Sequence, residues 1–272
     1  MTESGGSIAV ARRDRSARRP ARRRRGVFQT LVQVFGELLI TAGILLLLFV
    51  AWELWWTNIE SNAKQEEAVE NFIADLELPP TLTGETNNND DGGTVAAENV
   101  PVLGGLPAGE TFAVVYVPRF GEDYTRPVTS GVGTAVLDNL GLGHYPETGM
   151  PGAVGNFALA GHRQTNGAVL DNIHTFVPGD RIYVQTREGY YTYVYRNTQI
   201  VLPNRVDVLA PVPTQPDAEP VERILTLTSC NPRFGSQERI IAYAVMESFR
   251  PLDAGPPEGI ASQVYEAAEG AA

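Results

Sequence analysis

Apolar and polar positions divide the chain into a long apolar run, a polar stretch and a region of short alternating runs. Residues 38–56 read LLITAGILLLLFVAWELWW and are interrupted only by Glu53. Because a helix rises about 1.5 Å per residue, this run approaches the roughly 20 residues that cross a bilayer core. The pattern predicts one transmembrane helix over residues 36–57, with the tryptophans of WELWW at the membrane interface.

The basic residues are concentrated before this apolar run. Nine of the 21 are arginines between Arg12 and Arg25, whereas the chain after Gly26 has 12 basic and 30 acidic side chains, a net charge of −18. The positive-inside rule therefore predicts a cytoplasmic segment over residues 1–35 and an extracytoplasmic main domain. The acidic balance argues against nucleic acid as a partner of that domain. A cleaved signal peptide is the alternative, but the basic segment is unusually long for one, which favours a helix kept in the lipid bilayer.

Residues 58–110 are predicted to connect the anchor to the main domain. The first part, through Leu76, has apolar residues close to helical spacing and indicates a juxtamembrane helix. Pro79 and Pro80 end this pattern, and the following polar stretch, rich in Gly and Pro, predicts a flexible linker.

From Thr111 the chain shows short runs rich in β-branched and aromatic residues, separated by turn signals. The runs that predict strands are 112–117, 156–160, 181–186, 190–196, 199–202, 223–229 and 239–247. Two of them should form a hairpin that places Tyr191, Tyr193 and Tyr195 on one face. With a short helix over residues 135–140, the expected fold is mainly β, a closed or nearly closed antiparallel barrel spanning residues 111–252. The polar tail, residues 253–272, is expected to be disordered.

The only cysteine of the chain, Cys230, is a candidate nucleophile. It follows the apolar run ILTLTS and precedes Asn231-Pro232, so it should lie at a strand end, where reactive groups are commonly displayed. A lone thiol outside the cell cannot form an internal disulfide and is open to oxidation. Cys230 is therefore either a buried structural thiol or a thiol with a chemical function.

Two exported side chains have the chemistry to act with this thiol. His162 follows the run FALA-Gly161 and can shuttle a proton in acyl transfer. Arg239 begins the next strand, which a hairpin would return beside Cys230, where its guanidinium could donate hydrogen bonds to an oxyanion. The alternative for Arg239 is an exposed charge on an edge strand, and His174 is interpreted as an ordinary polar residue.

The motifs around these residues resemble those of sortases. Gly161-His162-Arg163, Thr226-Leu227-Thr228-Ser229-Cys230 and Arg239 are similar to the family's His, Thr-Leu-X-Thr-Cys and Arg motifs, over roughly residues 111–251. Gly143-His144-Tyr145-Pro146 resembles the class E branch. The resemblance implies an eight-stranded sortase barrel with His162, Cys230 and Arg239 as catalytic residues.

What the resemblance implies about function is a cell-surface cysteine transpeptidase of Gram-positive bacteria. Its substrates would be surface proteins with a C-terminal Leu-Ala/Pro-X-Thr-Gly sorting signal, cleaved between Thr and Gly through a thioacyl enzyme. The acceptor would be an amine of a cell-wall precursor or of another protein. The implied substrate-binding residues are His144, Tyr145, Thr228 and Ser229, although His144 and Tyr145 have packing roles as alternatives, and Ser229 stands where the family usually has Thr.

Three other functional classes are weighed against this one. A cell-wall cysteine peptidase would use the same thiol but release the acyl group to water, and a non-catalytic membrane-tethered adhesion or assembly domain would not need the thiol. An L,D-transpeptidase is disfavoured because its Ser-X-Gly-Cys setting is absent. No cofactor or metal is predicted, since the sequence has no zinc spacing, phosphate loop or EF-hand loop.

Overall fold

The structure is a computed structural model that describes residues 26–76 and 99–271. Most of the predicted cytoplasmic segment and most of the predicted linker lie outside the described residues. The chain falls into two units, Met1–Val50 and Ala51–Ala272, and each is treated by itself.

Helix α1 runs from Val27 to Ala74. By length and composition it qualifies as a membrane-crossing helix, and its apolar side chains are exposed over most of the predicted span. The predicted juxtamembrane helix is not a separate element, because no proline or turn signal interrupts the sequence between the two segments. Within the second unit, the last turns of α1 bury Val69, Phe72 and Ile73.

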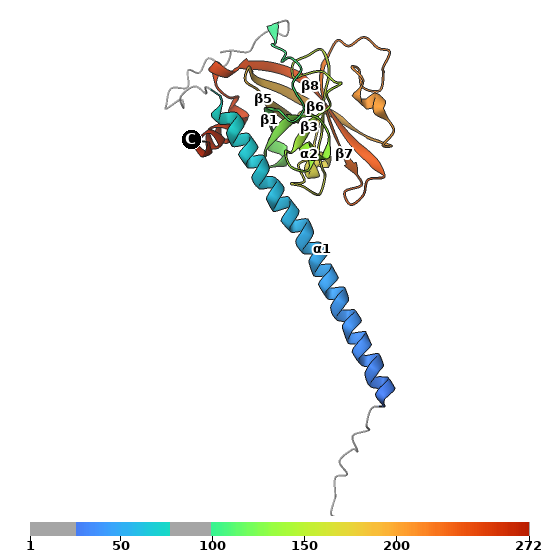
Figure 1. Cartoon of the computed structure of the whole chain (residues 1–272). Helices are drawn as coiled ribbons and strands as arrows, with labels where there is room; N and C mark the ends of the chain where they lie inside the picture. The colour runs from blue at the N-terminus through green and yellow to red at the C-terminus, as the bar shows by residue number, and fades with distance from the viewer. Residues whose placement is uncertain (1–25, 77–98, 272) are drawn as a thin grey trace, which may run out of the picture. The chain divides into compact units, whose positions relative to one another are not determined.

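In the described part of the chain, eight strands close into a barrel in the order β1-β2-β3-β4-β7-β8-β6-β5. Figure 1 shows this β domain together with helix α1. In chain order they are β1 (Thr111–Tyr116), β2 (Thr125–Ser130), β3 (Leu142–His144), β4 (Gly155–Ala160), β5 (Arg181–Gln185), β6 (Gly189–Val201), β7 (Arg223–Asn231) and β8 (Glu238–Pro251). The short helices between them are η2 (Pro118–Phe120), α2 (Thr134–Leu137), η3 (Asp171–Thr175) and η4 (Val206–Leu209). The mainly β, eight-stranded barrel is confirmed.

The barrel differs from the antiparallel prediction in two pairings. β2 pairs with β3 and β4 pairs with β7 in parallel, while the other neighbours are antiparallel. Strands β2 and β3 were not predicted, since β2 contains Pro127 and β3 has only three residues, too few to show alternation. The predicted strand 199–202 is the end of the long strand β6, which continues through a bulge between Tyr195 and Asn197.

The barrel interior is filled by alternate side chains from its strands. Tyr191, Tyr193 and Tyr195 all lie in this interior cluster, as the hairpin alternation predicted, and β5 pairs with β6 in the expected antiparallel register. Burial of these phenols requires partners: the Tyr193 hydroxyl accepts a hydrogen bond from Gly152 N at 3.0 Å, and the Tyr191 hydroxyl donates to Pro101 O at 2.9 Å.

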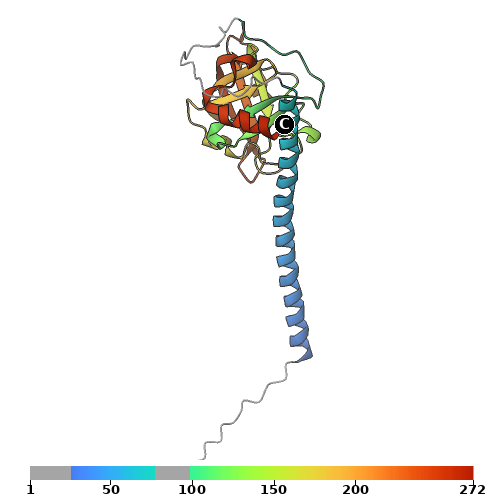
Figure 2. The ribbon, with the colours of Figure 1, turned by 90° about the vertical axis from the view of Figure 1, so that its left-hand side faces the viewer.

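The described part of the tail after the barrel, residues 253–271, is ordered, contrary to the prediction of a disordered tail. It forms η5 (Leu252–Ala254), η6 (Glu258–Ile260) and helix α3 (Ala261–Gly270). Ile260 and Val264, spaced i and i+4, are fully buried in a cluster on the outer wall of the barrel that also contains Val69 and Phe72 of α1. Figure 2 shows α3 beside the last turns of α1. Two buried apolar residues suffice to order this polar segment because α1 and the barrel wall supply the rest of the apolar surface.

Candidate active site

Cys230 lies next to the last residue of β7 and is half-buried. Leu225 and Leu227 of the same strand point into the barrel core, so by alternation Cys230 lies on the outer wall. Its register partner on β8 is Arg239, as predicted from the length of the β7–β8 hairpin.

The strand order of the barrel places His162 at the same end as Cys230. β4 pairs in parallel with β7, with Ala160 opposite Thr228, and Gly161 N continues the ladder with a 3.1 Å hydrogen bond to Thr228 O. His162 is therefore two residues beyond the level of Thr228, as is Cys230. The three predicted catalytic residues are brought together at the carboxyl ends of β4 and β7.

The imidazole of His162 has an acidic partner that the sequence did not reveal. Its Nε2 lies 2.7 Å from Oδ1 of Asp138, which follows α2. Asn166 Nδ2 donates to the same oxygen at 3.0 Å. A carboxylate only accepts hydrogen bonds, so Nε2 carries a proton, and Nδ1 is the ring nitrogen that Asp138 leaves free. Asp138 belongs to no motif, and no sequence signal singled it out.

The guanidinium of Arg239 is fixed from one side by the β7–β8 hairpin. Its Nη1 donates to the main-chain oxygens of Ser236 at 2.9 Å and Glu238 at 2.8 Å. Among the described residues, Nε and Nη2 have no hydrogen-bond partner. A planar group held at one nitrogen presents its remaining donors in a defined direction.

Arg163 is a second residue whose role the sequence reasoning missed, although it stands beside His162 in the quoted motif. It is 6% exposed, and its Nη1 donates to Cys230 O at 3.2 Å and to Asn231 Oδ1 at 2.5 Å. Burial lowers the pKa of the Arg163 guanidinium, but an arginine stays protonated at neutral pH. Arg163 therefore fixes the main chain at the thiol and places a positive charge beside it.

Two of the predicted substrate-binding residues form a polar pair on the outer wall. The hydroxyl of Tyr145, which is half-buried, lies 3.0 Å from Thr228 Oγ1, two residues before Cys230. Thr228 is 6% exposed, so Tyr145 covers part of the wall that leads to the thiol. A substrate role for both residues stays a prediction.

The other two predicted substrate-binding residues lie inside the structure. Ser229 is 4% exposed and donates from Oγ to Gly161 O at 2.8 Å, which ties β7 to the segment before His162. His144 is 3% exposed, packs edge-on against Phe112, and has Nε2 3.0 Å from Gly149 O. Burial lowers the pKa of His144. The buried setting of His144 agrees with its packing alternative, and Ser229 has a structural hydrogen bond, while a substrate role for either residue stays a prediction.

Gly161 is expected to be intolerant of a side chain. A Cβ there would lie 2.7 Å from Val169 Cγ2, 2.9 Å from Leu142 Cδ2 and 3.0 Å from Leu170 Cδ1, all of them buried. We expect Gly161→Ala to lower the free energy of unfolding by about 1–3 kcal/mol, because packed cores resist added volume. Chemical denaturation would measure this change. Gly105→Ala, where no atom lies within 4 Å of the new Cβ, is the control. Equal stability of the two variants would contradict the expectation.

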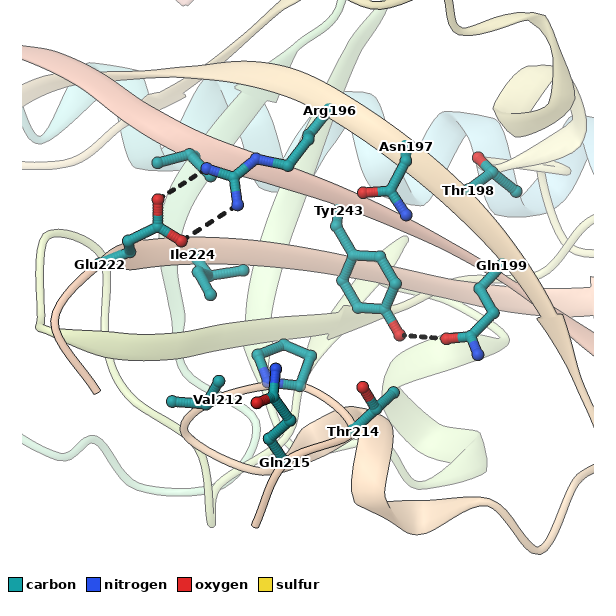
Figure 3. A pocket seen from close by; sticks show the side chains of 12 residues that line it. Arg196, Asn197, Thr198, Gln199, Val212, Thr214, Gln215, Glu222, Ile224 and Tyr243 are labelled. Atoms are coloured by element: carbon teal, nitrogen blue, oxygen red, sulfur yellow. Dashed lines mark hydrogen bonds and ion pairs between the residues drawn. The ribbon is translucent and has the colours of Figure 1, made fainter. Parts of the chain in front are cut away.

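The outer wall also carries a pocket of about 500 Å³ at the opposite end of β7. Figure 3 shows it between the β6–β7 connection and the β6–β8 sheet, with an Arg196–Glu222 ion pair on one side and a Tyr243–Gln199 hydrogen bond on the other. Its β7 residue is Ile224, six residues before Cys230, which is about 20 Å along an extended strand. None of the three predicted catalytic residues lines this pocket. Among the described residues, no group of His, Cys, Asp and Glu side chains is suited to hold a metal.

Known proteins share this barrel and its sequence. The model of the Sortase domain family matches residues 115–247. Sortase SrtE1 of Streptomyces coelicolor is 35% identical over 263 residues, covering 94% of this chain and 67% of that protein. Sortase E of Streptomyces avermitilis has a TM-score of 0.52 at 38% identity, covering 57% of this chain and 99% of that one. For sortase SrtA of Actinomyces oris the TM-score is 0.57 at 37% identity, with 59% and 92% covered.

These likenesses show that the protein is a cysteine transpeptidase. The chain belongs to the sortase family, and the relatives from Streptomyces support class E within it.

Proposed function

We propose that this sortase cleaves a C-terminal Leu-Ala/Pro-X-Thr-Gly sorting signal between Thr and Gly and transfers the new acyl end to an amine at the cell surface. The observation that carries the proposal is the meeting of His162, which follows β4, with Cys230 of β7 and Arg239 of β8 at one end of the barrel. The structure of sortase E1 from Streptomyces coelicolor with a tripeptide in its active site supports a peptide as substrate.

The proposed reaction has two acyl-transfer steps. His162 takes the thiol proton as the Cys230 sulfur attacks the Thr carbonyl carbon, and it gives this proton to the leaving amine when the Thr–Gly bond breaks. The acceptor amine then attacks the thioester carbonyl, His162 takes a proton from it, and the sulfur leaves as the new amide forms. Arg239 donates hydrogen bonds to the oxyanion in both steps, since its Nε and Nη2 are available.

The proposed location is a cell membrane crossed once by α1. The arginine-rich start of the chain would stay in the cytoplasm and the barrel would lie outside, according to the positive-inside rule. An anchored enzyme of this kind meets surface proteins and cell-wall precursors as they leave the membrane, which fits the proposed donor and acceptor.

The test is a peptide assay with and without an amine. The full chain in detergent is given a sorting-signal peptide, alone and with a glycine-type or diamine acceptor, and the products are weighed by mass spectrometry. We expect an acyl-enzyme on Cys230 and a ligated product that increases with acceptor. Hydrolysis that does not respond to any acceptor would instead support a cell-wall cysteine peptidase.

The role of Arg239 is tested by Arg239→Lys. We expect kcat to fall about 100-fold, because an ammonium cannot reproduce the forked contacts of a guanidinium at an oxyanion. The control is Arg181→Lys, which changes an exposed arginine paired with Glu247 on β8 and should leave kcat unchanged. A full rate for Arg239→Lys would remove the oxyanion assignment.

A further inference from the structure

We propose that Asp138 is a positioning residue for His162, and that residues 58–65 of α1 hold Asp138 in place. The inference rests on the proposed function for its kinetic part, but its structural part has an independent readout.

A hydrogen bond joins the side chains of Asp138 and His162. Asp138 Oδ1 lies 2.7 Å from His162 Nε2, and Asn166 Nδ2 fixes the same oxygen from the other side at 3.0 Å. This pair selects the imidazole tautomer with the proton on Nε2 and restrains rotation of the ring. Nδ1 is then the nitrogen available to exchange protons with the amines of the reaction.

Helix α1 contacts both segments that hold His162 in this hydrogen-bond network, the one at Asp138 and the loop after His162. Ser61 Oγ donates to Asp138 O at 2.9 Å, and Lys64 Nζ donates to Asn139 Oδ1 at 2.9 Å. On the loop after His162, Gln65 Nε2 donates to Asn166 O at 3.2 Å. Gly167 N donates to Asn58 Oδ1 at 2.9 Å. Asp138 and Asn166, the two partners in the hydrogen-bond network at His162, are thus each held by the same helix.

The packed face of α1 contains both polar and apolar residues. Ser61, Gln65, Val69 and Ile73 follow one another at i, i+4 spacing and are all buried. The face is apolar where it meets the barrel wall and the tail, and polar only where it meets these two loops. Burying polar side chains adds less stability than burying apolar ones of similar size, so their presence is explained by the geometry that they impose.

The contact between α1 and the loop after His162 is so close that a movement of one would move the other. Gln65 is 1% exposed, and a Cβ at Gly167 would lie 2.6 Å from its Nε2. Gly167 has φ +86°, which a glycine adopts without strain, so the main chain can approach the helix this closely. A shift of the helix would therefore move the loop that carries Asn166.

The first experiment replaces Asp138 with alanine in the full chain. We expect kcat to fall about 10- to 100-fold with KM changed less than about twofold, as for other residues that orient a functional histidine. The ¹⁵N chemical shifts of the His162 ring should change from mainly Nε2-protonated to a mixture of tautomers. This spectroscopic readout needs no turnover, so it can succeed even if the proposed reaction is wrong. Unchanged ring shifts would overturn the positioning role of Asp138.

The second experiment separates positioning from stability. Gln65→Leu keeps the packed volume but removes the hydrogen bond to Asn166, so we expect an equal or higher Tm together with a kcat lowered about 3- to 10-fold. The same variant should broaden or shift the His162 ring signals. Glu67→Ala, exposed on the same helix, is the control and should change neither. A Gln65→Leu enzyme with wild-type kcat and wild-type His162 signals would overturn the role of α1.

Discussion

Replacing Cys230 with alanine abolishes turnover, with kcat at least about 10⁴-fold below that of the wild type. The chain has no second cysteine, and no covalent acyl intermediate can form without the sulfur. Cys230 is half-buried and its only role in packing is that of a small side chain on the outer wall, so the variant should fold with a Tm close to that of the wild type. The measurement is transfer of a sorting-signal peptide to an amine, followed by mass spectrometry of the protein.

A comparison of Cys230→Ala with Cys230→Ser separates the chemical role of the thiol from its effect on folding. Cys230→Ser keeps a nucleophilic atom of nearly the same size, but a serine hydroxyl is not ionised near neutral pH, so we expect it to be almost as inactive as the alanine variant. Neither variant should gain mass when incubated with peptide. Substantial turnover by Cys230→Ala would show that the thiol is dispensable and would favour the adhesion or assembly alternative.

Replacing His162 with alanine lowers kcat by about 10²- to 10⁴-fold, the range typical of a lost general acid or base. The side chain of His162 is 28% exposed, lies outside the barrel's core cluster and donates one hydrogen bond, to Asp138, so we expect its removal to leave the barrel packing intact. The second half-reaction should suffer as well as the first, because both require proton transfer at an amine. Rapid mixing with peptide, followed by addition of acceptor, measures the two steps separately.

The matched control is His174→Ala. His174 is exposed on η3, and its Nδ1 lies 3.1 Å from Asp171 O. This variant should keep full activity. If His162→Ala retained the wild-type rate in both half-reactions, the proton-transfer role would have to be assigned to another group.

The candidate site was largely predictable because its parts are marked locally. Cys230 stands at the junction of an apolar strand and an Asn-Pro dipeptide, His162 follows a strand and a glycine, and Arg239 opens a strand at hairpin distance from the cysteine. The β7–β8 register confirmed the last of these expectations. By contrast, Asp138 and Arg163 act through side-chain hydrogen bonds to groups 24 and 67 residues away, which no local pattern reports.

The errors in the fold prediction also arise from contacts between segments far apart in the sequence. Helix α3 was predicted to be disordered because Ile260 and Val264 are too few to stabilise a helix alone, and the apolar face of α1 and the outer wall of the barrel together order them. The short strand β3 exists because β2 and β4 supply hydrogen bonds on both sides, not because its three residues favour extended structure. His144 looked as available as Tyr145 until burial separated them.

The sequence by itself determined most of the strands of the barrel, the apolar helix before it and the identities of the thiol, imidazole and guanidinium. Such features depend on near neighbours in the chain, whose periodicity and turn chemistry are visible in one dimension. The tertiary structure decided the parallel pairing of β4 with β7, the carboxylate at His162, and the polar face of α1 that holds it. These depend on hydrogen bonds between segments far apart in sequence, which form only when the closed barrel brings the segments together.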